Sequence, residues 1–318
     1  MIAHWDEVDS VRRERGHLRA AWANLGVAAG TVTVGLSRIK VDPGGWSTPA
    51  HIHGAEEEIF YVLDGAGVSW QDGETYEIGP RDCIVYPPDE QAHTLHTETG
   101  LDVLAFGQRV YDEAALLPRA GVQWLGHRWV TTGTDDDHPW KREAEAGPPE
   151  LSDGPSPRPS TIVNLADVES FDRHQETVRS TWTLLARAAG AELTGLNHVS
   201  VQPGKLAVPP HCHSAEEELF VVLDGDGHLE LTPTTYLEHE HGMTQEAHPI
   251  RAGHVVSRPA GSGIAHGFRA GPDGMTLLAY GTREPNDIAY YPRSNKVYLR
   301  GVKLMGRLEP LTYWDGEA

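Results

Sequence analysis

The chain has 318 residues, about twice the size of a typical domain, so two domains that each bury their own core are expected. Its 26 Lys and Arg residues stand against 46 Asp and Glu residues, which gives a formal net charge of −20. A protein so acidic repels the phosphate backbone of nucleic acids and an anionic membrane surface alike. We therefore expect no nucleic-acid partner and no membrane partner.

The cysteines and the N-terminal residues point to a reducing compartment. Cys83 and Cys212 fall one in each half of the chain and cannot build a disulfide framework. The stretch MIAHWDEVDS lacks the basic segment followed by an apolar one that marks a secretory signal, and no run of about 18 apolar residues occurs. The expected location is the cytoplasm, with both thiols free.

Short apolar runs with many β-branched residues follow one another through both halves, interrupted by Gly or Pro. They include TVTVGLSRIKV, EEIFYVLDG and DCIVYPP in the first half, and EELFVVLDG, HVVSRPAG and MTLLAYG in the second. Runs of this length bounded by turn residues are typical of antiparallel sheets closed into a sandwich or barrel, so the chain is predicted to be all-β. Helix is expected only at residues 9–25 and 169–187.

Residues 133–160 read GTDDDHPWKREAEAGPPELSDGPSPRPS, a segment rich in Pro, Gly and charged residues and nearly free of aliphatic ones. Such a segment cannot bury enough apolar surface to offset the entropy lost on ordering it. The sequence therefore predicts a surface linker at 133–160 between a first domain, residues 1–132, and a second domain, residues 161–318.

The two halves are copies of one domain. The stretch HIHGAEEEIFYVLDGAG, residues 51–67, returns as HCHSAEEELFVVLDGDG at residues 211–227, and the shift of 160 extends over the preceding residues without a gap. Further along, LAFG at 104–107 matches LAYG at 278–281 at a shift of 174. Gly225 and His266 lie 41 residues apart whereas Gly65 and His93 lie 28 apart, so the second half holds about 13 extra residues in this region. They fall in an acidic, His-rich insert within residues 232–250, for which three roles stay open: a lid, a second and weaker metal site, or a solvated loop.

The repeated His-x-His pattern can supply metal ligands. On a strand, His51 and His53 project to the same side about 6.6 Å apart, close enough to reach one ion. Glu58 would face the other side of a continuous strand, but the turn at Gly54-Ala55 returns it to the same ion. Because the strand after the turn is apolar on both faces, a carboxylate at its head needs a cation as its partner. The second half offers His211, His213 and Glu218 in the same way.

The other acidic and thiol groups of the repeat are expected to stay outside these sites. Glu57 and Glu217 have the wrong strand parity, while Glu56 and Glu216 lie in or beside the turn, so we predict that all four are solvated. Cys212 lies between two histidines of one strand and should point away from them.

In the strand before the repeat, Ser37-Arg38 corresponds to Asn197-His198. Alternation places one residue of each pair inside the barrel. Arg38 would there suit a carboxylate or phosphate, and an edge position facing water is the alternative.

The repeated pattern resembles the first motif of the cupin superfamily, Gly-x5-His-x-His-x4-Glu-x6-Gly. It fits position for position from Gly45 to Gly65, whereas in the second half Gly204 sits one residue too far upstream of the ligand positions. The resemblance covers nearly the whole chain outside the linker. It implies two tandem cupin barrels, each a double-stranded β-helix or jelly roll.

The second cupin motif adds a histidine as a fourth ligand, and the resemblance gives this role to His93 and His266. Asp82 and Glu90 replace glycines of that motif in the first half, and two extra residues precede His266 in the second. The resemblance implies one divalent metal ion in each domain. The ligand sets are His51, His53, Glu58 and His93 in the first domain, and His211, His213, Glu218 and His266 in the second.

Three imidazoles and one carboxylate suit Fe, Mn, Ni or Zn as the divalent ion, and donor softness does not choose among them. Similar two-barrel cupins include aromatic-ring and flavonol dioxygenases and oxalate decarboxylases, so the resemblance implies a metal-dependent enzyme acting on a small organic molecule, with dioxygenase-like oxidoreductases favoured. The decarboxylases grip oxalate with an Arg three residues before the His-x-His. Thr48 and Val208 occupy those positions here, which disfavours oxalate as substrate.

Two other functions stay open. One is a metal-dependent isomerase acting on a sugar or keto acid, and the other is a metal-containing binding or storage protein without turnover, since a fold does not fix a reaction. The sequence assigns no catalytic residue. The expected partner is a small-molecule substrate, and a homodimer is also left open.

Overall fold

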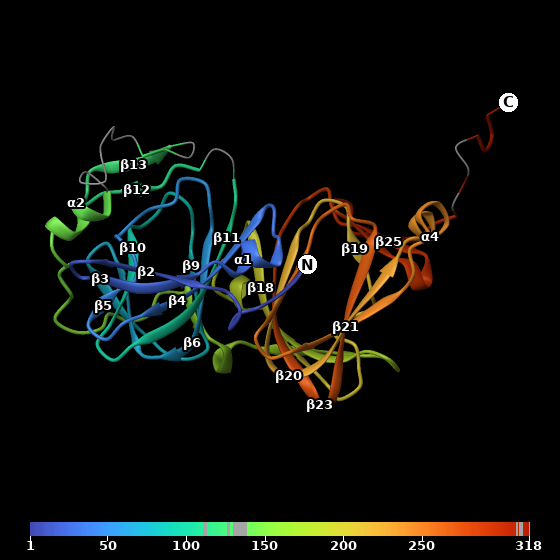
Figure 1. The fold of residues 1–318 in the computed structure, drawn as a ribbon, viewed down its shortest axis with the longest axis horizontal. Coiled ribbons are helices and arrows are strands. Elements are labelled where there is room, and N and C mark those ends of the chain that lie inside the picture. The colour runs from blue at the N-terminus through green and yellow to red at the C-terminus, as the bar shows by residue number, and fades with distance from the viewer. Residues whose placement is uncertain (111–112, 126–127, 130–138, 310, 312–313, 318) are drawn as a thin grey trace.

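The structure is a computed structural model that describes the chain except residues 111–112, 126–127, 130–138, 310, 312–313 and 318. Two β-barrels lie side by side, one formed mainly by the first half of the chain and the other mainly by the second half (Figure 1). The all-β fold class predicted from the sequence is confirmed. No helix in the described ranges is long and apolar enough to cross a membrane.

The first barrel is built on a largely antiparallel sheet, to which the described residues contribute eleven strands. In chain order these strands are β2 (Ser10–Arg15), β3 (Leu18–Ala23), β4 (Val34–Val41), β5 (Gly45–Trp46), β6 (Glu58–Gly65), β7 (Gly67–Gln71), β8 (Glu74–Ile78), β9 (Asp82–Tyr86), β10 (His93–Thr97), β11 (Leu101–Gln108) and β15 (Ile162–Asn164). Across the sheet the order is β15-β9-β6-β11-β4-β3-β5-β10-β7-β8, with β2 beside β3.

The second barrel repeats this plan with eight strands in the described part of the chain. They are β1 (Ile2–His4), β16 (Ser170–His174), β17 (Arg179–Thr183), β18 (Thr194–Val201), β20 (Glu218–Pro233), β21 (Glu246–Arg251), β22 (His254–Arg258) and β23 (Ile264–Thr282). Their order is β1-β22-β20-β23-β18-β17-β16, with β21 beside β20.

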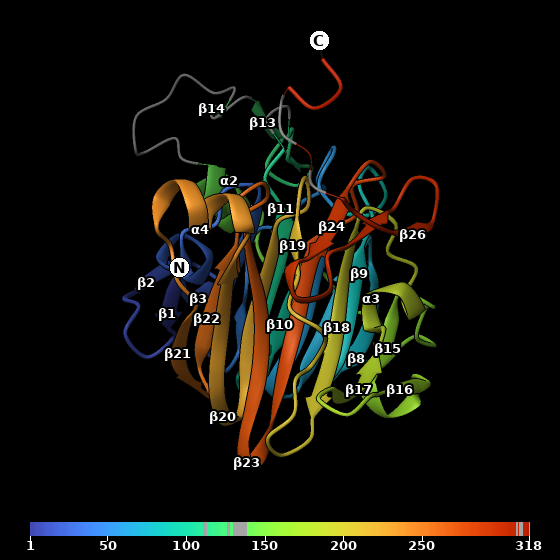
Figure 2. The ribbon, with the colours of Figure 1, turned by 90° about the vertical axis from the view of Figure 1, so that its right-hand side faces the viewer.

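Two small sheets and several short helices complete the structure, and Figure 2 shows the small sheets, α2 and α4 toward one end of the barrels. The small sheets are β12 (Leu116–Leu117), β13 (Val122–Leu125) and β14 (Arg128–Trp129), and β19 (Cys212–His213), β24 (Ile288–Tyr291), β25 (Lys296–Leu299) and β26 (Leu304–Arg307). The helices are α1 (Leu25–Ala29), α2 (Pro139–Glu145), α3 (Leu185–Ala188) and α4 (Thr235–His241), and the 3-10 turns are η2 (Leu165–Asp167) and η3 (Pro292–Ser294).

The barrels exchange their first strands. β1 pairs antiparallel with β22 of the second barrel, with Ile2 opposite Val256. At the equivalent place in the repeat, β15 pairs with β9 of the first barrel, with Ile162 opposite Ile84. Each half therefore completes the sheet of the other. The predicted domain boundaries stay a prediction, because a cut between the halves in sequence does not separate the two sheets.

Alternation along the strands places most of the buried apolar residues in three large cores. On β6, Phe60 and Val62 face the interior of the first barrel, whereas Ile59 and Tyr61 face a core shared with the second barrel. The interior of the second barrel has its own core. Since β6 buries both faces, it is apolar on both, as its sequence indicated.

The two predicted helical stretches are wrong. Residues 9–25 form mostly the β2–β3 hairpin and residues 169–187 mostly the β16–β17 hairpin, each followed by a short helix. In β3, buried positions recur at both ends of Leu18–Ala23, and this strand also pairs with β4. Sheet pairing on both sides of β3 outweighs the helix propensity of its alanines.

Part of the predicted linker packs against the first barrel. Residues 130–138 lie outside the described residues, and α2 follows them. On α2, Trp140 is buried in a core cluster with Leu18 and Trp46, and Glu143 is buried beside Arg119. This stretch is therefore anchored by one apolar and one ionic contact.

Most of the extra residues of the second half lie at one hairpin. In the first barrel, β7 and β8 are joined by the tight turn at Asp72-Gly73. In the second barrel, β20 and β21 are joined through α4, which carries exposed acidic and histidine side chains. The insert therefore extends one end of the second barrel.

Candidate metal sites and the adjoining pocket

The first ligand set converges inside the first barrel. The Oε2 atom of Glu58 lies 3.0 Å from Nε2 of His93, 3.7 Å from Nε2 of His51 and 3.8 Å from Nε2 of His53. One ligand atom from each of these four residues lies within 4.8 Å of the others. The four side chains assigned from the cupin resemblance are therefore brought together by the fold.

The second ligand set has nearly the same geometry. Glu218 Oε2 lies 3.0 Å from Nε2 of His266, 3.3 Å from Nε2 of His213 and 4.0 Å from Nε2 of His211. His211, Glu218 and His266 form a mutual cluster, while His213 joins it through Glu218. Although the second cupin motif is incomplete in both halves, its histidine, His93 or His266, lies in each candidate site.

The backbone explains why the first and last histidines of each set meet. His51 and His93 form an antiparallel bridge, with hydrogen bonds of 3.2 Å and 3.0 Å between their backbone amides and carbonyls. His211 and His266 form the matching bridge, with bonds of 3.2 Å and 2.9 Å. Directly opposed residues of an antiparallel pair project to the same face, so both rings point into the barrel.

Hydrogen bonds to the second ring nitrogen orient most of these imidazoles. Nδ1 of His51 lies 2.9 Å from the Pro49 carbonyl oxygen, and Nδ1 of His211 lies 3.0 Å from that of Pro209. Nδ1 of His93 lies 3.1 Å from the Gln91 carbonyl oxygen. A carbonyl can only accept, so each Nδ1 carries the proton and each Nε2 presents a lone pair to the centre of its site.

The sequence analysis missed a carboxylate that holds the middle histidine of each set. Glu113 Oε1 lies 3.2 Å from Nδ1 of His53, and Asp287 Oδ2 lies 2.6 Å from Nδ1 of His213. Both carboxylates also accept backbone N–H groups of the turn that follows, including Ala55 and Ala215 at 3.0 Å. The signal was present, because Glu113 and Asp287 match at the same shift of 174 as the LAFG and LAYG stretches.

Electrostatics favour a positive charge at both centres. Burial lowers the pKa of His53, but the hydrogen bond to Glu113 and the charge of Glu58 raise it overall to about 9. The pKa of His213 is likewise raised to about 9, since burial is outweighed by Glu218 and other acidic neighbours. The excess of negative charge that stabilises a proton here would stabilise a metal cation in the same way.

The remaining groups of the sites are in the form that binds metals. Burial and a neighbouring histidine lower the pKa of His93 to about 4 and that of His211 to about 3, so both rings are neutral at pH 7. Burial raises the pKa values of Glu58 and Glu218, but the surrounding histidines hold both well below the ordinary carboxyl range. Neutral imidazoles and ionised carboxylates are the ligand forms that divalent ions require.

The second site also contains polar atoms that need a partner. His213 Nε2, His266 Nε2 and Glu218 Oε2 are buried and have no hydrogen-bond partner among the described residues. Ligand atoms that bind one ion at about 2.0–2.2 Å lie about 3–3.5 Å from one another. The observed separations of 3.0–4.0 Å between Glu218 and its three histidines are close to this spacing. The residues present therefore fit a divalent metal ion.

The expectation that the other glutamates of the repeat are solvated is wrong. Glu57 is 2% exposed and Glu217 is 1% exposed, because the outward face of their strands meets the other barrel. Glu216 is buried and pairs with Arg300, while Glu56 is partly buried near His53. Burial raises the pKa of both Glu56 and Glu216 to about 7.

Each outward-facing glutamate clamps a loop of the opposite barrel. Glu57 accepts the backbone N–H groups of Glu192 and Thr194, at 2.8 Å and 2.9 Å, and the Thr194 hydroxyl. Glu217 accepts the N–H groups of Val32 and Thr33, at 2.9 Å and 2.5 Å, and the Thr33 hydroxyl. Strand alternation predicts correctly that Glu57 and Glu217 face away from the ligand clusters, but it does not predict that the other barrel covers this face.

The structure also decides which residue of Ser37-Arg38 lines the first barrel. Arg38 lies outside the barrel, where it forms two hydrogen bonds to Asp102 at 2.9 Å and 2.7 Å and stacks over the Trp5 ring. Its side chain is mostly buried, so neither an internal anion site nor a free edge position is found. Ser37 and its counterpart Asn197 therefore point inward.

Two smaller expectations have different outcomes. Cys83 and Cys212 are buried free thiols, and Cys212 lies outside the ligand clusters, as predicted. The His-rich insert gives no support for a second, weaker metal site. Among the described residues, no cluster of potential ligands includes a residue of 232–250. A lid and a solvated loop stay as alternative predictions for the insert.

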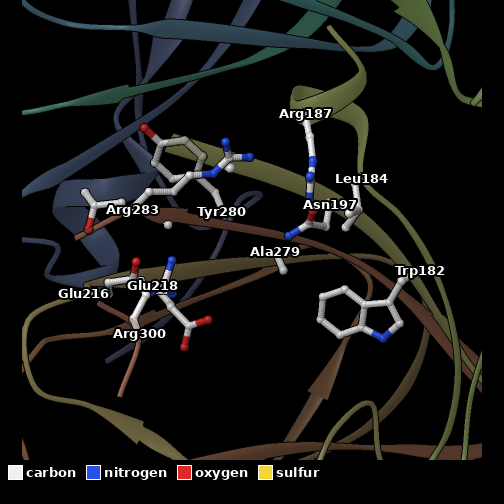
Figure 3. A pocket seen from close by; sticks show the side chains of 13 residues that line it. Trp182, Leu184, Arg187, Asn197, Glu216, Glu218, Ala279, Tyr280, Arg283 and Arg300 are labelled. Atoms are coloured by element: carbon white, nitrogen blue, oxygen red, sulfur yellow. Dashed lines mark hydrogen bonds and ion pairs between the residues drawn. The ribbon is translucent and has the colours of Figure 1, made fainter. Parts of the chain in front are cut away.

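A pocket of about 410 Å³ reaches Glu218 of the second site. Its walls come from strands β17, β18, β20 and β23, helix α3 and the C-terminal segment, as Figure 3 shows. Trp182, Asn197 and Ala279 line its inner part, and Arg187 lies on α3. A volume of this size is within the range of small-molecule sites.

The comparisons with known proteins agree with this architecture. The family model described as "Cupin domain" matches residues 37–106. An uncharacterized protein of Methanocaldococcus jannaschii is 41% identical over 46 residues, which span 14% of this chain and 37% of that protein, so the match covers just over a third of this relative.

Two solved structures show the likeness of the whole fold. Oxalate decarboxylase from Bacillus subtilis has 13% sequence identity and a TM-score of 0.57, over 88% of this chain and 75% of that one. Vicilin from hazelnut, Corylus avellana, has 15% identity and a TM-score of 0.57, over 91% and 87%. At this identity the likeness concerns the fold alone. The family match thus shows a cupin domain at residues 37–106, and the likeness to these two structures shows that the chain has the all-β, two-barrel cupin fold.

Proposed function

We propose that the protein is a metal-dependent enzyme that holds one divalent ion in each barrel and acts on a small organic molecule. The observation that carries this proposal is that three buried potential ligand atoms, Nε2 of His213, Nε2 of His266 and Oε2 of Glu218, have no hydrogen-bond partner among the described residues. Each buried polar atom left unsatisfied costs about 1–3 kcal/mol, and a bound cation would remove that cost for all of them at once. The proposed ligands are the two sets predicted from the sequence.

The residues around each ion would position it and expose one side to substrate. The carbonyls of Pro49, Gln91 and Pro209 fix the ring orientation of three ligands, while Glu113 and Asp287 fix the rings of two more. When bound, the ion would act as a Lewis acid toward an oxygen atom of the substrate. The pocket beside Glu218 gives a small molecule access to the second site.

For the reaction itself we favour a dioxygenase-like oxidation, with isomerisation of a sugar or keto acid as the alternative. The mixed nitrogen and oxygen donor set suits Fe(II), which supports oxygen chemistry, and suits Mn(II), Ni(II) and Zn(II) as well. The likeness to oxalate decarboxylase does not extend to the arginine before the His-x-His, since Thr48 and Val208 occupy those positions. A cytoplasmic location, the absence of nucleic-acid and membrane partners, and a homodimer stay predictions.

Elemental analysis of protein purified without added metal tests the proposal. We expect about two divalent ions per chain, and iron together with oxygen uptake on catechol-like substrates would support the oxidation. Zinc in both sites without oxygen uptake would instead favour the isomerase or a binding protein without turnover. Protein that stays metal-free after incubation with each of the four ions would overturn the proposal.

A further inference from the structure

The pocket beside Glu218 is rich in positive charge, although the chain as a whole has a net charge of −20. Three arginines line it, Arg187, Arg283 and Arg300, against two carboxylates, Glu216 and Glu218. Arg300 forms an ion pair with Glu216, and Glu218 belongs to the metal site. Two guanidinium groups of the pocket are therefore left without a carboxylate partner in the lining.

The positions of these two guanidinium groups suit a ligand. In Figure 3, Arg187 extends from α3 toward Asn197, and it forms no ion pair with any described carboxylate. Arg283 donates Nη1 to the Ala191 carbonyl at 2.7 Å and forms no ion pair with a described carboxylate either. Both retain N–H donors for an anion in the pocket.

A fourth arginine, outside the pocket lining, raises the positive potential around Glu218. Arg258 lies directly opposite Glu218 in the pairing of β22 with β20, so both side chains face the barrel interior. Arg258 is only 9% exposed, donates Nη2 to the Ile264 carbonyl, and has a buried Nε without a partner among the described residues. The charge of Glu218 acts on this guanidinium, so Arg258 offsets part of the negative charge of the second site.

The first barrel lacks this concentration of charge. Val27 stands where the shift of 160 places Arg187, and Tyr86 stands opposite Glu58 where Arg258 stands opposite Glu218. Arg109, the counterpart of Arg283, is kept and makes the same kind of bond to a backbone carbonyl. The barrels thus differ at two cationic positions, Arg187 and Arg258, and both lie near the second candidate metal site.

We propose that the second barrel binds its substrate through a carboxylate group in the pocket beside Glu218, and that Arg187 is the residue that selects for this group. This inference rests on the proposed function, because it gives the substrate class for the same site. A guanidinium binds a carboxylate through two parallel N–H···O bonds, which neutral groups of similar size cannot accept as strongly. The Trp182 ring and the Ala279 side chain supply an apolar wall for the rest of the molecule.

Calorimetric titration with acetate, succinate and benzoate, and with benzyl alcohol as a neutral analogue of benzoate, tests the proposal. We expect at least one carboxylate to bind saturably at one site per chain, and benzyl alcohol to bind much more weakly. Arg187→Val, which installs the residue of the first barrel, should weaken carboxylate binding about tenfold or more. Arg307→Val removes a charge from the exposed strand β26 and should bind as the wild type does.

Three results would overturn the inference: no carboxylate of the three binds, Arg187→Val binds as the wild type does, or benzyl alcohol binds as tightly as benzoate. Inorganic phosphate that binds more tightly than every carboxylate would overturn the choice of carboxylate. Titrating metal-replete and chelator-treated protein separates the two proposals. Metal-loaded protein that binds no carboxylate would refute this inference alone, whereas Arg187-dependent binding in a protein that takes up no metal would refute the proposed function alone.

Discussion

In the first barrel the Tyr86 ring stacks on His93 with ring centroids 3.8 Å apart, whereas in the second barrel His266 lies near Phe220, with Arg258 at the position of Tyr86. The Tyr86 hydroxyl is held by Ser69 at 2.7 Å, so the ring is fixed against the histidine. The second barrel instead has a pocket that reaches Glu218. The metal-site side chains are thus the same, but their surroundings have diverged.

The two barrels are alike in the contacts that they make with one another. The exchanged strands β1 and β15, the clamps made by Glu57 and Glu217, and the ring contact between Phe106 and Tyr280 each occur at matched positions. These contacts lie between the barrels, so a change in one copy is constrained by the other. The walls of each metal site face only their own barrel, and there the two copies are free to differ.

Removing one ligand histidine from each barrel in turn should have the largest effect. We expect His51→Ala to abolish metal binding at the first site and leave the second filled, and His211→Ala to do the reverse, because each site has its own four ligands. Metal content per chain, measured by elemental analysis, should fall from about two ions to about one in either variant.

Cys212→Ser is the matched control, since Cys212 lies beside two ligands but outside their cluster, and it should keep both ions. Loss of both ions in either histidine variant would show that the sites are coupled rather than independent. Retention of both would show that the histidine is not a ligand.

The clamps between the barrels should give the next largest effect. Glu57→Ala leaves three backbone N–H groups and the Thr194 hydroxyl without their acceptor. Glu217→Ala does the same to the N–H groups of Val32 and Thr33 and to the Thr33 hydroxyl. We expect each variant to lower the free energy of unfolding by about 2–4 kcal/mol, measured by urea denaturation. The two costs should be similar, because Glu217 also accepts the Ser257 hydroxyl and each carboxylate then accepts from four groups.

Glu77→Ala, on an exposed position of β8, is the control and should change stability by less than about 0.5 kcal/mol. If either clamp variant is as stable as this control, the interface does not depend on these carboxylates. If only one variant is destabilised, the two clamps are not equivalent despite their matched positions.

Much of the fold and of the two candidate metal-ligand clusters could be predicted because the signals are local and repeated. The alternation on β6 and β20, the His-x-His spacing and the duplicated motif all depend on residues near one another in sequence. Even His93 and His266, far from their partners, follow from the family pattern.

The missed features depend on contacts between distant segments. Nothing near Glu57 in the sequence indicates that its side chain meets the loop before β18. The sequence therefore predicts a solvated residue where the structure has a buried one. The helix prediction at residues 9–25 and 169–187 is wrong because these residues become strands by pairing with β4 and β18, which are distant in sequence. Glu113 was missed because its acceptor role depends on a turn about 60 residues earlier.

The smallest expected effect concerns a position where the outer faces of the barrels differ. Arg38 in the first barrel is paired with Asp102, whereas its counterpart in the second barrel is the partly buried imidazole of His198. Burial, followed by the charge of Arg81, lowers the pKa of His198 from 6.5 to about 4. The unfolded chain therefore binds more protons than the folded chain between pH 6.5 and about 4, and His198 makes stability decrease as the pH falls through this window.

His198→Gln should therefore reduce the slope of stability against pH between pH 6.5 and 4, and leave the slope above pH 7.5 unchanged. Urea denaturation at a series of pH values, with metal-replete protein, measures this slope. His174→Gln, on the exposed strand β16, serves as the control and should leave the profile of the wild type intact. Equal slopes for His198→Gln and the wild type would mean that His198 takes up its proton without cost in the folded protein. The outer faces of the barrels would then respond alike to acid, and their divergence would be confined to the walls of the metal sites.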